Sequence, residues 1–175
     1  IKGPLVERFL DIVLTPIRQP EMLWIVVPLF IALFLMQSYF GRNKTEELGW
    51  NTAYGNSIAL IFVSLDLMRR VYTSYNLSFY EIDKAFGTGD FNTIYYIKIM
   101  FAVGLFVWGL VLAGLNFFHW LPKSISFFIC SSIPINITAF VAIVLVYSEK
   151  IAFDWTTFFA SIILLAVAFL FFKTY

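Results

Sequence analysis

Residues 125–147 read ISFFICSSIPINITAFVAIVLVY, and this stretch decides the class of fold. It contains no Asp, Glu, Lys or Arg from one end to the other. A helix needs roughly 20 apolar residues to cross a hydrocarbon core about 30 Å thick. The stretch therefore predicts a membrane-spanning helix, and the rest of the chain is interpreted outward from it.

The composition of the whole chain supports the same class. Of 175 residues, 61% are hydrophobic and only 13% are charged, against about 25% charged residues in an ordinary soluble domain. A soluble domain of this length could not bury so much apolar surface, whereas lipid can cover it. The composition predicts an all-α, polytopic integral membrane helix bundle whose first partner is the lipid bilayer.

Three further apolar runs are long enough to cross a bilayer, and they cover residues 22–40, 96–115 and 155–172. Residues 51–68 form a weaker candidate because they begin with the polar stretch NTAYGNS. We therefore expect one transmembrane domain, 1–175, with four to five spans. Gly55/Ala59 and Gly109/Ala113 have the small-x-x-x-small spacing that lets membrane helices approach closely.

Two shorter segments are predicted to be amphipathic helices outside the bilayer core. Residues 4–14 start with a proline and carry their charges on one face. Residues 78–86 start with Ser78 and Glu81, which form an S-x-x-E capping box. Both are expected to lie in the cytoplasmic membrane surface, and the alternative for each is a short connector packed on the bundle.

The distribution of Lys and Arg predicts the orientation, because cytoplasmic loops carry an excess of these residues. With five spans and a cytoplasmic N-terminus, eight Lys and Arg residues lie inside and four outside. With only four spans the bias falls to seven against five. The charges therefore favour five spans, with the N-terminus in the cytoplasm and the C-terminus outside.

Residues able to carry out chemistry are few. The chain has one His and one Cys, with no metal-ligand spacing around either, and no catalytic motif. A net charge of +1 gives no electrostatic case for nucleic acid as a partner. We expect no cofactor, no metal site and no catalytic residue, and hence a protein that is not an enzyme.

The strongest local cluster of polar residues is EELGWNTAYGNS at 46–57. On a helix that starts early, positions i, i+4 and i+7 share a face, which would align Glu47, Asn51 and Tyr54. The cluster is either a cation, substrate or partner site at the outer membrane face, or a helix start with interfacial polar groups. Its candidate residues are Glu46, Glu47, Asn51, Tyr54 and Asn56.

Two other candidates, Asp66 and Asn136, lie at or near membrane depth. Asp66 can pair with Arg69 and Arg70 on its own helix face, so it is either the ion pair that ends a helix or a coupling carboxylate. Asn136 follows Pro134, which would kink the helix and free a backbone carbonyl for nearby side chains. The alternative for Asn136 is a pore-lining position.

The segment ERFLDIVLTPIRQPEML at 7–23, with Pro16, Pro20 and Glu21 ahead of the first span, resembles the opening of prokaryotic members of the YIP family of small membrane proteins. The resemblance covers most of the chain but is architectural: an amphipathic N-terminal segment followed by five spans. It implies membrane scaffolding or trafficking without catalysis. It assigns a role to no single residue.

Two functions are compatible with these features. The first is a non-enzymatic membrane scaffold or a subunit of a larger complex, with other membrane proteins or further copies of the chain as partners. The second is a small oligomeric channel or transporter that uses polar residues of the second and fourth spans. It requires an oligomer, because so small a bundle leaves little room for a pore.

Overall fold

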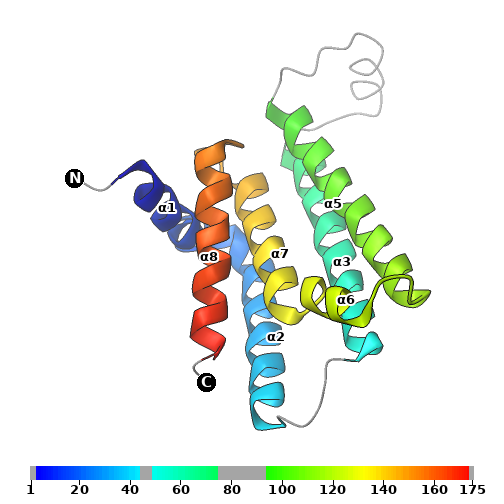
Figure 1. The fold of residues 1–175 in the computed structure, drawn as a ribbon. Helices are drawn as coiled ribbons and strands as arrows, with labels where there is room; N and C mark the ends of the chain where they lie inside the picture. The colour runs from blue at the N-terminus through cyan, green and yellow to red at the C-terminus, as the bar shows by residue number, and fades with distance from the viewer. Residues whose placement is uncertain (1–2, 44–48, 75–93, 174–175) are drawn as a thin grey trace.

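The structure is a computed structural model, and it describes residues 3–43, 49–74 and 94–173. In these residues the chain forms helices and no strand, so the all-α prediction is confirmed. The elements are α1 (Pro4–Arg18), η1 (Pro20–Met22), α2 (Leu23–Arg42), α3 (Trp50–Ser74), α5 (Ile94–Phe117), α6 (Lys123–Ile129), α7 (Ser132–Tyr147) and α8 (Trp155–Lys173), as drawn in Figure 1.

Four stretches are both long and apolar enough to cross a membrane: Pro20–Arg42, Ile94–Phe117, Lys123–Tyr147 and Trp155–Phe172. They coincide with the four stronger predicted spans. The chain is therefore a multi-pass membrane helix bundle. Helix α3 covers the weaker candidate, 51–68, but is not among the four.

Helix α7 occupies the centre of the bundle. Within the most apolar window of its stretch, 67% of the residues are buried, against 11% in the corresponding windows of α2 and α8. Helices α1, α2, α3, α5 and α8 all contact it. Its apolar side chains thus form most of the core, while α2 and α8 are peripheral.

Helices α3 and α5 form the most extensive helix pair in the described residues and lie side by side in Figure 1. Trp50 at the start of α3 contacts His119 just past the end of α5, with ring centroids 4.3 Å apart. Further along, Gly109 lies so close to Ile61 that a Cβ added there would come within 2.8 Å of its Cγ1. Helix α3 therefore follows α5, antiparallel, along its length.

The predicted span 125–147 is interrupted. Helix α6 ends at Ile129 and α7 begins at Ser132, and the two meet at an angle in Figure 1. Pro134 lies in the first turn of α7, where a missing N–H breaks no helical hydrogen bond. The predicted proline kink is thus replaced by a full break at Cys130 and Ser131, just ahead of the proline.

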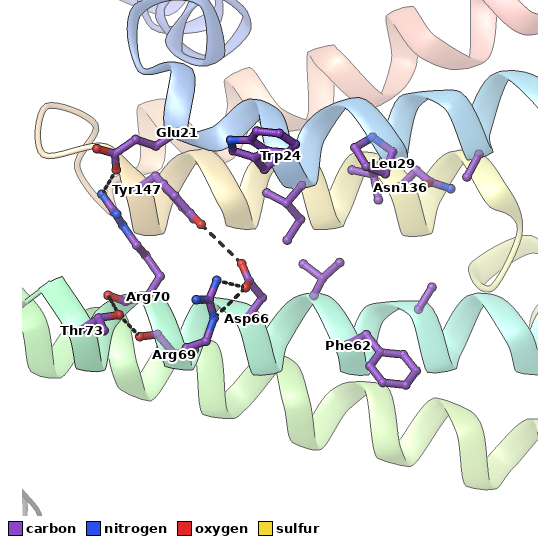
Figure 2. A pocket seen from close by; sticks show the side chains of 15 residues that line it. Glu21, Trp24, Leu29, Phe62, Asp66, Arg69, Arg70, Thr73, Asn136 and Tyr147 are labelled. Atoms are coloured by element: carbon purple, nitrogen blue, oxygen red, sulfur yellow. Dashed lines mark hydrogen bonds and ion pairs between the residues drawn. The ribbon is translucent and has the colours of Figure 1, made fainter.

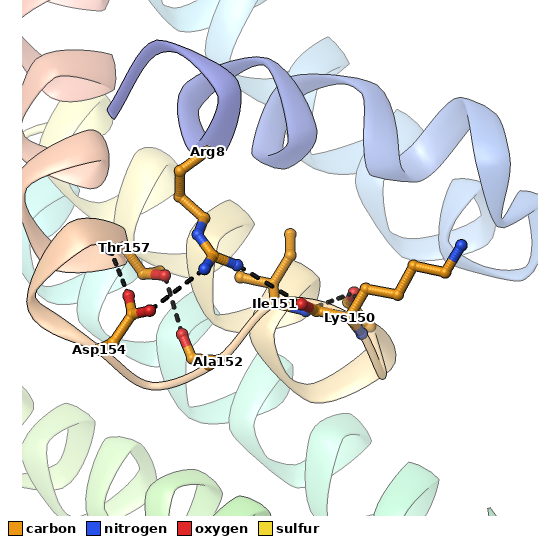
Figure 3. A network of polar contacts seen from close by, with 7 residues as sticks. Arg8, Lys150, Ile151, Ala152, Asp154 and Thr157 are labelled. Atoms are coloured by element: carbon orange, nitrogen blue, oxygen red, sulfur yellow. Dashed lines mark hydrogen bonds and ion pairs between the residues drawn. The ribbon is translucent and has the colours of Figure 1, made fainter. Parts of the chain in front are cut away.

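Helix α1 contains the predicted 4–14 helix and continues through Pro16 to Arg18. Figure 3 shows how Arg8 ties it to the loop between α7 and α8: the guanidinium donates to Asp154 at 3.2 Å and to the Lys150 carbonyl at 3.5 Å. The predicted helix 78–86 lies outside the described residues.

Asp154 also caps α8, since its carboxylate accepts the Thr157 N–H at 2.7 Å. Hydrogen bonds from the Thr157 backbone and side chain, with a smaller contribution from Arg8, hold the pKa of Asp154 below its ordinary value. The Asp154 carboxylate thus caps the N-terminus of α8 and also holds Arg8 of α1.

The positive side chains of the described residues gather near one end of the bundle. Arg8 contacts the loop after α7, Arg70 reaches Glu21 at the start of the α2 stretch, and Lys98 donates to the Ser148 carbonyl. At the opposite end, α2 closes with Arg42 and α6 opens with Lys123. The end that carries α1 therefore holds most of the Lys and Arg side chains of the described residues, and it also holds their Asp and Glu side chains.

We predict that Gly109→Ala weakens the contact between α3 and α5. The new methyl group would meet both the side chain and the backbone of Ile61, and overpacking of this kind typically costs about 1–3 kcal/mol. The measurement is thermal unfolding in detergent. Gly104→Ala on the same helix is the matched control, because a Cβ there has open space. Equal melting of the two variants would contradict the close approach.

We predict that Asp154→Ala destabilises the fold by about 0.5–2 kcal/mol through loss of the α8 cap. Because the folded pKa is lowered, the contribution of the ionised carboxylate is complete above the unfolded pKa of about 3.9 and is lost as pH falls through the folded value. Unfolding followed across acidic pH checks this. Asp154→Asn should keep most of the cap at neutral pH yet lose this acid dependence, and an unchanged acid profile would count against the assignment.

Candidate functional site

An elongated groove of about 750 Å³ lies between α2 and α3, with α7 as its floor. Both walls pack against α7 but hardly touch each other, which leaves the groove open along its length. Figure 2 shows the charged side chains gathered at one end, Asn136 at the other, and Trp24, Leu29 and Phe62 along the length between them. The groove is therefore charged at one end and mostly apolar along the rest of its length.

Two ion pairs form its charged end. Arg70 of α3 reaches across to Glu21 at 2.5 Å, and Arg69 binds Asp66 of its own helix through two nitrogens at 2.6 and 3.1 Å. The predicted partnership of Asp66 is thus half right: it pairs with Arg69, whereas Arg70 pairs with Glu21. The Arg69 side chain is 72% exposed and that of Glu21 66%, so both stay accessible.

Tyr147 at the end of α7 joins the two pairs. Its hydroxyl donates to the second carboxylate oxygen of Asp66 at 3.4 Å, and the Arg70 guanidinium lies 4.6 Å from the centre of its ring. Figure 2 shows these groups reaching toward one another from opposite sides of the groove, at one end of it. Two carboxylates, two guanidinium groups and a phenol therefore meet where α2, α3 and α7 converge.

Of the predicted site residues, the structure brings two together. Asp66 and Asn136 line the same groove, Asp66 at its charged end and Asn136 deeper, on the floor. The Asn136 amide donates to the Ser132 carbonyl at 2.6 Å, so it also supports the first turn of α7. Within one chain, Asn136 thus lies on the floor of an open groove.

The other candidates lie elsewhere. Asn51 is exposed in the first turn of α3, and Tyr54 packs its ring 5.9 Å from that of Phe117. The Asn56 amide donates to the Cys130 carbonyl at 2.8 Å. In a continuous helix the N–H of residue 134 would bind that carbonyl, but Pro134 has none. Glu46 and Glu47 lie outside the described residues.

Behind Asn56 lies a buried polar cluster that the sequence did not single out. The Asn116 amide donates to Ser57 Oγ and to Cys130 Sγ, both at 3.1 Å, and to the Leu112 carbonyl at 2.8 Å. Ser126 in turn donates to the Asn116 carbonyl oxygen. These side chains are almost fully buried and join α3, α5 and α6, so the cluster is a structural fastening.

Sequence reasoning missed three groove residues, namely Glu21, Arg70 in its cross-helix role, and Tyr147. Each lies at a helix end where an interfacial position explains the residue type, so the sequence offered no signal of convergence. Lys98 was also missed as a buried cation: it is 2% exposed and donates to the Ser148 carbonyl at 3.0 Å. A lysine inside an apolar run was the one available hint.

Within the described ranges, no group of three or more His, Cys, Asp or Glu side chains could hold a metal ion. Comparison of the chain with protein-family models, with curated proteins and with solved structures finds no match. The function must therefore be argued from the geometry of the bundle.

We predict that Asn56→Ala destabilises the bundle by about 1–2 kcal/mol, because the Cys130 carbonyl loses its donor in a low-dielectric setting. Unfolding in detergent measures the effect. Asn51→Ala is the matched control, since that amide is exposed on the same helix. If the two variants unfold alike, the Asn56 hydrogen bond contributes nothing to stability.

Proposed function

We propose that the chain is a non-catalytic membrane protein that acts as a scaffold or as a subunit of a larger membrane complex. The observation that carries the proposal is a contrast among the described helices: one group is held together by buried hydrogen bonds, whereas two peripheral helices are not. Buried polar contacts tie α3, α5 and α6 to one another and to Cys130, in the break that precedes α7. Helices α2 and α8 are mostly exposed and offer long apolar faces to the bilayer and to whatever lies in it.

Those faces are wide and rich in large side chains. Phe34 and Leu35 on α2 are 62% and 61% exposed, and Leu170 on α8 is 67% exposed. Helices in a bilayer associate through van der Waals packing and interhelical hydrogen bonds. A face of this kind on each of two helices would let one chain meet two neighbours, as a scaffold requires.

The proposal includes five crossings. Helix α3 has 25 residues, which at 1.5 Å per residue gives about 37 Å, enough to span the core. It follows the apolar helix α5 along its length, so α3 would share the depth of α5. Its polar residues Asn56 and Ser57 bond within the protein and so need not face lipid.

The proposed orientation has the α1 end in the cytoplasm and the C-terminal end of α8 outside. The supporting observation is the gathering of Arg8, Arg18, Arg69, Arg70, Lys98 and Lys150 near the α1 end, because positive residues favour the cytoplasmic side. The resemblance to the YIP family implies the same arrangement and a scaffolding role.

The second candidate, an oligomeric channel or transporter, draws on one observation. Asp66 and Asn136, both at or near membrane depth, line one groove. A path across the membrane would need several copies around it, because in one chain this groove is open along its length and is not an enclosed channel. A clean homo-oligomer with no other polypeptide would therefore favour this candidate.

We predict that a photo-crosslinking amino acid at Phe34 or Phe159 gives a discrete protein adduct in native membranes, because these positions lie on the proposed partner faces of α2 and α8. Val107 on α5 is the matched control, since it is exposed to the same extent as Phe159, 51%. Gel mobility and mass spectrometry identify the products.

A stoichiometric second polypeptide in native mass spectrometry, together with adducts at Phe34 or Phe159 but not at Val107, would support the scaffold. Lipid adducts alone at all three positions would contradict it. So would equal protein capture at Val107, because partners would then not select the peripheral helices.

A further inference from the structure

The length of the α2–α3 groove is closer to the thickness of one leaflet than to that of two. Its lining runs from Glu21 of η1 to Ala32 of α2, on α7 from Tyr147 to Asn136, and on α3 from Thr73 to Ala59. These eleven to fourteen residues of helix cover about 16–21 Å, which is well short of a hydrocarbon core roughly 30 Å thick. A transmembrane partner helix would need a groove as long as the hydrocarbon core is thick, and a transport path would have to cross both leaflets. The groove is too short for either.

The groove also has the polarity of a lipid. Its charged end lies near the C-terminal ends of α3 and α7, at the expected membrane–water interface. Its apolar walls extend from there toward the middle of the bilayer, past Trp24 and Phe62. A volume of about 750 Å³ falls within the range of about 300–1,000 Å³ typical of small-molecule sites. The occupant that matches this order, polar group at the interface and apolar tail within, is a membrane lipid of that leaflet.

The charges at the mouth select the headgroup. Arg69 and Arg70 offer guanidinium forks that suit phosphate oxygens, while Glu21 and Asp66 offer acceptors to a cation. Two positive and two negative groups match a headgroup that carries one charge of each sign. An anionic headgroup without a cation would meet both carboxylates unshielded. A primary ammonium can donate hydrogen bonds to a carboxylate, and a quaternary one cannot.

The existing ion pairs can open for such a ligand. Arg69 uses only two of its nitrogens on Asp66, and its side chain is largely exposed. Arg70 contacts Glu21 through one nitrogen, and Glu21 is largely exposed too. Ion pairs open to solvent contribute little to stability, so exchange of a carboxylate for a phosphate costs little.

We propose that this groove binds one zwitterionic, amine-bearing phospholipid from the leaflet that holds its charged end. The phosphate lies on Arg69 and Arg70, the ammonium on Glu21 and Asp66, and one acyl chain along the apolar walls of α2 and α3. The site requires only that the bundle be embedded in a bilayer and is independent of any protein partner.

The test is native mass spectrometry of the full chain in mild detergent after removal of bound lipid. An equimolar mixture of phosphatidylethanolamine, phosphatidylcholine and phosphatidylglycerol with identical acyl chains is then added. We expect one phosphatidylethanolamine per chain, preferred over each of the other two by about tenfold, because all three lipids share the phosphate but only this one has a primary ammonium that can donate charge-assisted hydrogen bonds to the carboxylates.

Two kinds of variant separate the headgroup from the tail. The double change Arg69→Gln and Arg70→Gln should lower phosphatidylethanolamine retention about tenfold, whereas Arg42→Gln at the far end of α2 should not. Ala59→Phe adds a ring to the groove wall and should abolish retention without altering charge. Leu65→Phe, exposed on α3 outside the groove lining, is its matched control. Thermal unfolding verifies that each variant is folded.

Equal retention of the three lipids would overturn the headgroup assignment, and an adduct that survives Ala59→Phe would overturn the site itself. A photo-crosslinker at Phe62 gives an independent readout if a variant fails to fold. An adduct there that is enriched in phosphatidylethanolamine over the other two lipids supports the proposal, and an adduct with another protein or a second copy of the chain refutes it.

Discussion

The structure depends on one constraint: a polar group at membrane depth needs a partner within the protein, because lipid offers none. The break between α6 and α7 is where this constraint acts most strongly, since a broken helix leaves backbone groups unpaired. Asn56 of α3 donates to the Cys130 carbonyl, and Asn116 of α5 binds Ser57 and Cys130. These contacts draw α3 and α5 against the break, although the Ser132 hydroxyl, which is also buried there, has no hydrogen-bond partner in the described part of the chain.

The groove follows from the same arrangement. Helix α7 offers one side to α3 and another to α2, so the two stand apart over it. At one end Arg70 of α3 reaches Glu21, just ahead of α2, and there Tyr147 of α7 also reaches Asp66 of α3. At that end water can solvate the charges, whereas deeper in, the walls carry apolar groups apart from Asn136. The division into a charged mouth and an apolar trough thus reflects membrane depth.

Much of the fold could be predicted from the sequence because length and hydropathy decide it. The four apolar stretches and the pair between Asp66 and Arg69 depend on local spacing, which a sequence displays directly. The sequence predicted a kink at Pro134 and not a break ahead of it, and the donor that binds the Cys130 carbonyl at the break is Asn56, which is 74 residues away from Cys130. Helix periodicity does not encode such contacts.

The candidate site shows the same limit more sharply. Asp66 and Asn136 were singled out separately, and only the packing of α3 on α7 places both in one groove. Gly55 and Gly109 share the same spacing to a following alanine, but only Gly109 meets a neighbouring helix. The same small-x-x-x-small spacing therefore gives a close helix contact at Gly109 and none at Gly55, because only Gly109 lies on a face that packs against another helix.

The pairing of α3 with α5 also bears on how the chain reaches the membrane during synthesis. Helix α3, with Asn56 and Asp66, is made before the apolar partner that follows 44 positions later, counted from Trp50 to Ile94. At about 5–20 residues per second the ribosome needs roughly 2–9 s to reach that partner. If α3 crosses the bilayer as proposed, it must be held by the insertion machinery for that interval, and the two helices would then enter the lipid together as a hairpin.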